Sequence, residues 1–305
     1  MNDESSLEQF WNPTEPNESE GSYRKLLAAA ENVPAPDRSY LADLYSRIAR
    51  AEAAQVKLKD AHASLKKAEH LLQEAGGAPR VSATIRWHLE TGRLHVLEKT
   101  PSQARSHLVI AWKLATDSGE DDLAVQIALM MSAIEPQKQQ QDWIVRAIRL
   151  AEDSPNQHVK RWLGSLYSAL GWKQYDLRQF ETALKTFEKA FGHLQTHGTR
   201  REVFVAKWSI GKVLRIMGRT EQALDIQNDL LTELRTGGAG AAGGAGGSNG
   251  GRVFEELAEC LHILKRTAEA QPYFELAYRE LSSDTWVVDN QPVLLKRLKD
   301  LGKVK

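Results

Sequence analysis

The sequence is poor in cysteine and carries no excess of charge. Its 305 residues include one cysteine, Cys260, and the formal net charge is zero. A single cysteine excludes an intramolecular disulfide and a cysteine-based zinc finger. Zero net charge argues against a general nucleic-acid binder, which usually carries a basic excess. No apolar run reaches the roughly 18 residues of a membrane span, and the acidic start MNDESSLEQF lacks the apolar core of a secretory signal. These absences favour a soluble cytoplasmic protein with no nucleic-acid or membrane partner.

Motifs for catalysis are also missing. No Ser-His-Asp order, HExxH motif or P-loop occurs. His193 and His197 are four residues apart and could share a metal ion, but no carboxylate or cysteine completes a ligand set. We interpret His88 and His95 as hydrogen-bonded core histidines and Cys260 as a small buried side chain. The sequence therefore predicts no enzyme, no cofactor and no metal.

What the sequence does contain is a repeated pattern of small residues. Counted from an anchor residue, small side chains recur at offsets 12 and 19 in most copies, with a larger residue at offset 16. Small residues let two antiparallel helices cross closely, and each helix pair leaves an apolar face that only the next pair can cover. The copy at the third anchor is degenerate. The anchors are Ala49, Gly92, Ala128, Gly171, Gly211 and Ala258.

The stretch LGWKQYDLRQFETALKTFEKA, residues 170–190, shows the pattern best. It has an aromatic and then Leu-Gly on the first helix, and Ala, an aromatic and Ala on the second. The matching residues are Tyr167, Leu170, Gly171, Phe180, Ala183, Phe187 and Ala190. This arrangement resembles the tetratricopeptide repeat (TPR) family, over residues 36–280. Its spacing exceeds the family's usual period of about 34 residues, as in the long-repeat variants of kinesin light chains and some bacterial regulators.

The resemblance implies an all-α fold, a right-handed solenoid of antiparallel helix pairs with about six repeats. It also implies a non-enzymatic protein-protein interaction scaffold. An irregular helical bundle is the alternative fold. A ligand-responsive regulator is the alternative function.

Composition divides the chain into four parts. Residues 1–20 hold six acidic side chains and no lysine or arginine, so we expect a disordered acidic tail. Residues 21–236 are predicted to form a leading helix and five repeats. Residues 237–251, GGAGAAGGAGGSNGG, read as a flexible linker, natural or engineered. Two glycine-rich catalytic patterns inside it lack the strand that their chemistry needs. Residues 252–305 are predicted to form the sixth repeat and a C-terminal capping helix.

In the TPR family, the first helix of each pair lines a concave groove. The resemblance therefore implies a set of partner-binding positions at fixed offsets from the anchors. Arginine and aromatic side chains are common energetic anchors of interfaces, and together they suit an extended peptide with acidic and apolar side chains. The alternative is a merely solvated face. The positions are Arg47, Arg50, Arg86, Arg93, Gln126, Trp172, Tyr175, Trp208, Lys212 and Arg215, followed by the acidic Glu255, Glu256 and Glu259.

The N-terminal tail offers a partner within the chain. It is acidic, and it carries the apolar residues Leu7, Phe10 and Trp11. These features complement the arginine and aromatic positions of the groove. We therefore hypothesise that residues 1–20 dock there and act as an autoinhibitory segment that the true ligand must displace.

Overall fold

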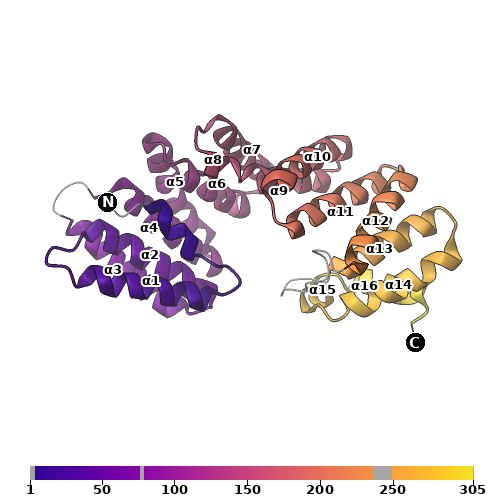
Figure 1. The fold of residues 1–305 in the computed structure, drawn as a ribbon, viewed down its shortest axis with the longest axis horizontal. Coiled ribbons are helices and arrows are strands. Elements are labelled where there is room, and N and C mark those ends of the chain that lie inside the picture. Colours follow the sequence, from indigo (N-terminus) through magenta and orange to yellow (C-terminus); the bar gives the residue numbers. More distant parts are fainter. Residues whose placement is uncertain (1–3, 76–78, 237–248, 305) are drawn as a thin grey trace. The chain divides into compact units, whose positions relative to one another are not determined.

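The computed structural model of the chain describes residues 4–75, 79–236 and 249–304, which form helices and no strand. Two compact units make up the chain, Met1–Val159 (unit 1) and Lys160–Lys305 (unit 2) (Figure 1). In the described ranges, no helix has both the length and the apolar character needed to cross a membrane. Residues 237–248 of the predicted linker, with most of the two catalytic patterns, lie outside the described residues.

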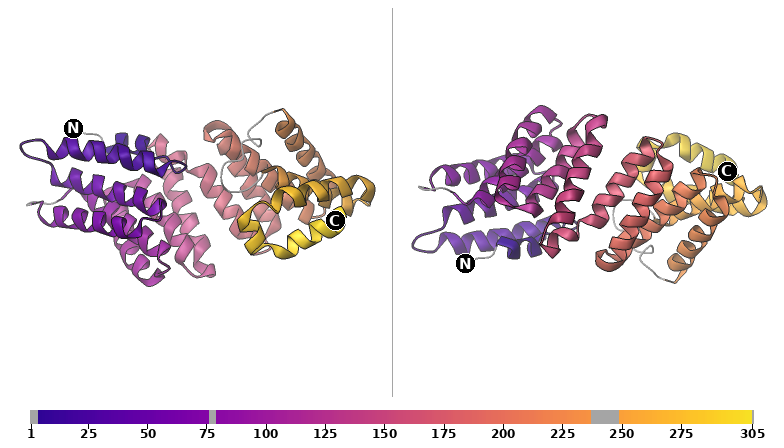
Figure 2. Two further views of the ribbon diagram at one scale, coloured as in Figure 1. Left: turned by 90° about the horizontal axis from the view of Figure 1, so that it is seen from below. Right: turned by 90° about the horizontal axis from the view of Figure 1, so that it is seen from above.

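Unit 1 begins with the 3₁₀ helix η1 (Glu4–Phe10) and with α1 (Pro16–Glu31). Three antiparallel pairs follow: α2 (Arg38–Ala54) with α3 (Leu58–Gln73), α4 (Val81–Leu97) with α5 (Pro101–Ser118), and α6 (Asp121–Ile134) with α7 (Gln137–Asp153). The one-turn helix α8 (Gln157–Lys160) lies at its end. Helix α1 packs on α2, and the first helices α2 and α4 lie side by side (Figure 2).

Unit 2 also contains three antiparallel pairs: α9 (Leu163–Asp176) with α10 (Phe180–His197), α11 (Arg200–Ile216) with α12 (Thr220–Arg235), and α13 (Asn249–Ile263) with α14 (Thr267–Leu281). The short helix α15 (Thr285–Asn290) leads into α16 (Pro292–Gly302), which packs against α14. All six predicted helix pairs are therefore present, and the all-α fold class is confirmed.

The turn that joins the two helices of a pair has the same backbone conformation in most pairs. Five of the pairs have a left-handed residue seven positions after the anchor: Val56, Lys99, Arg178, Gly218 and Lys265. The amide of the next residue donates to a carbonyl five residues earlier, a bond that closes the end of the first helix. The third pair has Pro136 at that donor position and an extended Glu135 before it. Because proline has no N–H, it cannot make this bond, which explains why the third copy is degenerate.

The glycine anchors are required by the close crossing of the helices. A Cβ atom on Gly171 would lie 2.6 Å from the ring of Phe187, and one on Gly92 would lie 2.8 Å from Leu108. Both contacts join offset 0 to offset 16, as the spacing predicts. Cys260 is fully buried, as expected, and burial followed by the nearby Glu256 raises its pKa to about 12.

Two predicted boundaries differ from the structure. Residues 4–20, expected to be disordered, form η1 and the start of α1. Leu7 is buried there in an apolar cluster with Tyr23, whose hydroxyl donates to the carbonyl of Leu7 at 3.2 Å. Residues 249–251, expected to be linker, form the first turn of α13, where a Cβ on Gly251 would lie 2.9 Å from Leu281. In both places tertiary contacts outweigh a composition typical of irregular chain.

Candidate functional site

An arginine cluster lies on the first helices of unit 1. Arg47 and Asp43 are one turn apart on α2, and Arg47 Nε donates to Asp43 Oδ2 at 2.7 Å. Arg86 reaches the other oxygen of Asp43 from α4, also at 2.7 Å. All three side chains are buried, and Arg47 is only 1% exposed. A buried carboxylate thus fixes two guanidinium groups at the seam between α2 and α4.

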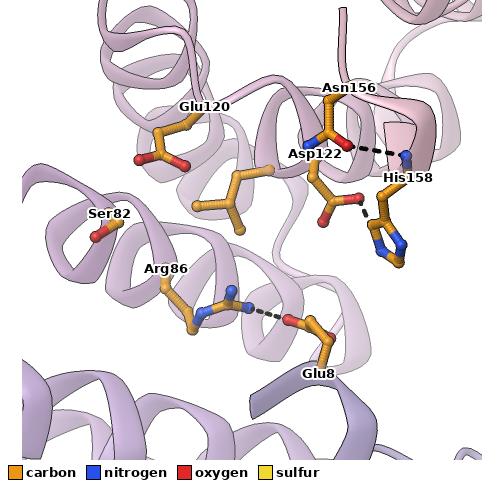
Figure 3. Close-up of a pocket in the computed structure, with 8 residues that line it drawn as sticks. Glu8, Ser82, Arg86, Glu120, Asp122, Asn156 and His158 are labelled. Atoms are coloured by element: carbon orange, nitrogen blue, oxygen red, sulfur yellow. Dashed lines mark hydrogen bonds and ion pairs between the residues drawn. The ribbon is translucent and has the colours of Figure 1, made fainter. Parts of the chain in front are cut away.

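The open side of this cluster is occupied by Glu8 from η1. One carboxylate oxygen of Glu8 lies 2.9 Å from Arg47 Nη1 and 3.0 Å from Arg86 Nη1, and the other lies 3.7 Å from Arg50 Nη1. Arg86 and Glu8 point toward one another (Figure 3). Burial alone would raise the pKa of Glu8, but Arg86, Arg47 and Arg50 outweigh it and hold the pKa at about 2. Glu8 is therefore a bound carboxylate anion.

Next to Glu8, Trp11 covers Arg50. The Arg50 guanidinium lies 4.0 Å from the centroid of the Trp11 ring, within the range of a cation–π contact. Burial lowers the pKa of Arg50, with Glu90 opposing and Arg93 adding to the effect. Arg93 donates to Glu90 at 2.7 Å. The charges on this part of the face therefore contact one another and the N-terminal segment.

A pocket of about 410 Å³ adjoins the arginine cluster (Figure 3). Gln126, a predicted site residue, donates to one of its lining residues, Asp122, at 2.8 Å. Three carboxylates and one arginine line the pocket, and Glu8 forms part of its wall. The lining residues are Glu8, Ser82, Arg86, Glu120, Asp122, Leu123, Asn156 and His158.

In unit 2, three aromatic side chains from the predicted set form one patch. The ring of Trp172 lies 5.3 Å from that of Tyr175 and 5.8 Å from that of Trp208. All three are half-buried. The Trp208 indole N–H donates to the carbonyl of Arg252 at 3.2 Å, which ties the patch to α13. A small hollow of about 140 Å³ lies beside Trp208.

The cations of unit 2 also have a carboxylate partner. Glu256 of α13 is fully buried and contacts Lys212 Nζ at 2.7 Å and Arg215 Nε at 2.6 Å. Burial opposes the charged forms, but the contacts lower the pKa of Glu256 and raise the pKa of Lys212 and Arg215. Both cations also belong to the predicted binding set.

Most of the polar and charged residues of the predicted binding set are buried against partners within the chain. Arg47, Arg86 and Gln126 are buried, and Lys212 and Arg215 are largely buried beside Glu256. First helices of successive pairs pack together, and a cation on such a seam needs a nearby anion. Asp43 was not identified from the sequence as the anion that pairs with Arg47 and Arg86. The sequence does indicate this pairing, since Asp43 and Arg86 share offset −6 in successive repeats.

A histidine network in unit 1 was only partly anticipated. Nδ1 of His88 lies 3.0 Å from Nδ1 of His107, and Nδ1 of His95 lies 3.1 Å from the Thr100 hydroxyl. Burial lowers the pKa of His88 to about 4, with a smaller contribution from His107. His62 joins the network through ring contact with His95. In the part of the chain that the structure describes, no three His, Cys or carboxylate groups are placed to hold a metal ion.

Comparison with known proteins places the fold. No protein-family model matches the sequence, and no curated protein is significantly similar to it. A signal transduction ATPase with a tetratricopeptide repeat sensor, from Pyrococcus horikoshii, is 15% identical in sequence and aligns with a TM-score of 0.70. The alignment covers 94% of this chain and 42% of the other, so this chain spans less than half of that protein. This chain has the TPR fold.

Two further TPR-like structures cover nearly the whole chain. The apo form of RapI aligns over 97% of this chain and 78% of its own, with a TM-score of 0.74 and 10% identity. NprR in complex with its cognate peptide NprX aligns over 99% of this chain and 85% of its own, with a TM-score of 0.57 and 15% identity. At these identities the likeness is one of fold.

Proposed function

We propose that the protein is a non-enzymatic TPR scaffold that binds a peptide segment with acidic and apolar side chains. The proposed binding positions are the arginine cluster (Arg47, Arg50 and Arg86) with Arg93 and Gln126 in unit 1, and the aromatic patch (Trp172, Tyr175 and Trp208) in unit 2. Lys212 and Arg215, which contact Glu256, would support the patch from beside it.

The observation that carries this proposal is a peptide segment already bound to unit 1. Glu8 places its carboxylate between Arg47 and Arg86, and Trp11 lies over Arg50. The segment is acidic and aromatic, the chemistry proposed for the ligand. Charge-assisted contacts of a carboxylate with arginine are among the strongest polar contacts in proteins. A face that holds such a segment in the chain can hold one from a partner.

The neighbours in fold support a peptide as the class of ligand. NprR was crystallised with its cognate peptide NprX. A Rap protein complexed with Competence and Sporulation Factor also has this fold, with a TM-score of 0.52. Another neighbour is named aspartyl phosphate phosphatase F. We nevertheless infer a binding protein, because the proposed face in unit 1 consists of four arginines, each paired with a carboxylate, and one amide, Gln126.

A second candidate function is a peptide-responsive regulator in which the N-terminal segment is autoinhibitory. The contacts of Glu8 and Trp11 favour it, because the segment covers the same arginines that an incoming ligand would need. Under this proposal the scaffold and the regulator share one binding face. They differ in whether ligand binding releases the N-terminal segment.

Selection from a displayed random-peptide library on the full chain tests the proposal. We expect enrichment of peptides that combine Asp or Glu with Leu, Phe or Trp. Binding of peptides that use the arginine cluster should fall at least about tenfold in Arg93→Glu, and binding of peptides that use the aromatic patch should fall as much in Trp172→Ala, since arginine and tryptophan are typical interface anchors.

Matched controls separate binding from general damage. Arg149→Glu changes an exposed arginine on the second helix α7, and Trp286→Ala removes a tryptophan that is 58% exposed on α15. Both controls should bind the selected peptides as wild type does, and circular dichroism should show all four variants folded. Selected peptides without acidic residues, or equal binding by all variants, would refute the proposed face.

A further inference from the structure

The five residues Leu7–Trp11 have a spacing that matches the face on which they lie. Side chains three apart are eclipsed in a 3₁₀ helix. Leu7 and Phe10 therefore share one side of η1, and Glu8 and Trp11 share the next. The backbone keeps this register past Phe10, because the amide of Trp11 donates to the carbonyl of Glu8 at 3.0 Å.

Each side of this turn contacts a different surface. Leu7 and Phe10 pack into the apolar cluster of α1 and α2, where Leu7 is 3% exposed and the Phe10 ring meets the Tyr23 ring edge-on. Glu8 and Trp11 contact the arginine cluster. Gln9, between the two sides, is exposed. Four of these five consecutive side chains therefore contact one of the two surfaces.

From this geometry we infer that the arginine cluster and the apolar cluster of α1 and α2 together recognise a specific motif, a leucine-glutamate-any-aromatic-tryptophan sequence bound as a single helical turn. The partner is a peptide segment that carries this motif, and Leu7–Trp11 is a copy of it in the same chain. This inference rests on the proposed function and deepens it. It replaces the extended peptide expected from the sequence with a short helical one.

Two features make the bound segment replaceable by a ligand. Glu8 is 23% exposed and forms part of the wall of the 410 Å³ pocket, so its site is open to solvent on one side. The cluster also has unused donors, because Arg47 Nη2 and Arg50 Nε are buried without a hydrogen-bond partner among the described residues. A carboxylate in a slightly different position could use these donors as well.

The test uses the full chain and a labelled synthetic peptide, ESSLEQFWN, which corresponds to residues 4–12. Fluorescence anisotropy would measure its binding to wild type and to the full-length double variant Leu7→Ala/Glu8→Gln. The double variant removes the two anchors of the segment in the chain. We expect the peptide to bind the double variant at least about tenfold more tightly than it binds wild type. In the double variant the peptide no longer competes with the chain's own segment.

Two control peptides define the motif. A peptide with Glu8→Gln should bind at least about tenfold more weakly, the loss expected when a charged hydrogen-bonded carboxylate is removed. A peptide of the same composition in scrambled order should lose binding to the same degree. Equal binding of all three peptides would overturn the motif, and absence of binding to a folded double variant would make the segment a purely structural cap.

If the double variant does not fold, the binding of the three peptides to wild type alone tests the motif. The matching peptide should still bind wild type, weakly, and better than either control peptide. Failure of the inference is distinct from failure of the proposed function. If library peptides bind the full chain but ESSLEQFWN neither binds nor competes with them, the scaffold remains and the motif is wrong.

Discussion

The two units neutralise the cations on their first helices with carboxylates of different origin. In unit 1, Glu8 belongs to a short segment outside the helix pairs, and its side chain is 23% exposed. In unit 2, Glu256 belongs to the first helix of the next pair and is fully buried. Both contact two cations at 2.6 to 3.0 Å.

This difference in origin suggests different roles for the two carboxylates. Glu8 can leave the arginine cluster while α2 and α4 stay packed, because Asp43 still holds both Arg47 and Arg86. Glu256 cannot leave Lys212 and Arg215 unless α13 separates from α11. Under the proposed function, a ligand would therefore replace the first carboxylate, whereas the second holds successive repeats together. The surface of unit 2 proposed to contact a partner is then mainly its aromatic patch.

The largest expected effect comes from removing the carboxylate of unit 2. Glu256→Gln would remove the carboxylate that Lys212 and Arg215 share and leave Lys212 with only Glu255, at 3.8 Å from its Nζ. Loss of one partner from a buried ion pair costs about 3 to 5 kcal/mol. Glu8→Gln should cost clearly less, because Glu8 is partly exposed and Asp43 remains. Urea denaturation followed by circular dichroism would compare the two variants. Equal losses would mean that Glu8 is as structural as Glu256.

One pair of unit 2 also differs at the position that faces the anchor. Offset 16 is Leu65, Leu108 or Ile144 in unit 1 and Phe187 or Phe274 in two pairs of unit 2, but the fully buried Gln227 takes this place opposite Gly211. Neither polar atom of the Gln227 side chain has a hydrogen-bond partner among the described residues. Gln227→Leu should therefore stabilise the protein, by about 1 to 3 kcal/mol, because an unsatisfied buried polar group is removed.

A neighbouring position provides the control for that change. Asn228 is exposed on the same helix, α12. Asn228→Leu should leave the free energy of unfolding within about 0.5 kcal/mol of wild type. If Gln227→Leu were neutral or destabilising, the amide of Gln227 would have a role in packing that its contacts do not explain.

Much of the fold was predictable from the sequence, because the close packing of the helices requires small and large residues at regular spacings. The anchors and offsets located all six helix pairs, and offset 7 turned out to mark the left-handed turn residues of five. The N-terminal segment was not predictable in this way. Its composition is typical of disorder, and only tertiary contacts of Leu7 and Glu8 order it.

The candidate site was predictable in residue type but not in exposure. Offsets identified the charged and aromatic side chains of the first helices, and the three aromatic residues do lie together. A pattern within one repeat cannot show which charges meet across the seam between repeats. That information lies in pairs such as Asp43 and Arg86, which become partners only when successive helices stack.

The smallest expected effect is a pH dependence that arises in unit 1. The folded protein holds the pKa of His88 at about 4, below its ordinary 6.5, mainly through burial. Burial, followed by His95, also lowers the pKa of His107, with Glu69 opposing. Below about pH 6.5, His88 and His107 therefore bind protons more readily in the unfolded chain than in the folded chain. Stability is fully present above about pH 6.5 and is lost as the pH falls toward about 4.

Urea midpoints between about pH 7.5 and pH 5 would reveal this loss, and His88→Gln should reduce it. His197→Gln, at an exposed histidine in unit 2, should keep the slope of wild type. Because His88 and Arg86 both belong to α4, loosening of the network at acid pH would also weaken peptide binding at the arginine cluster. An unchanged slope in His88→Gln would place the acid sensitivity outside this network and leave the arginine cluster independent of it.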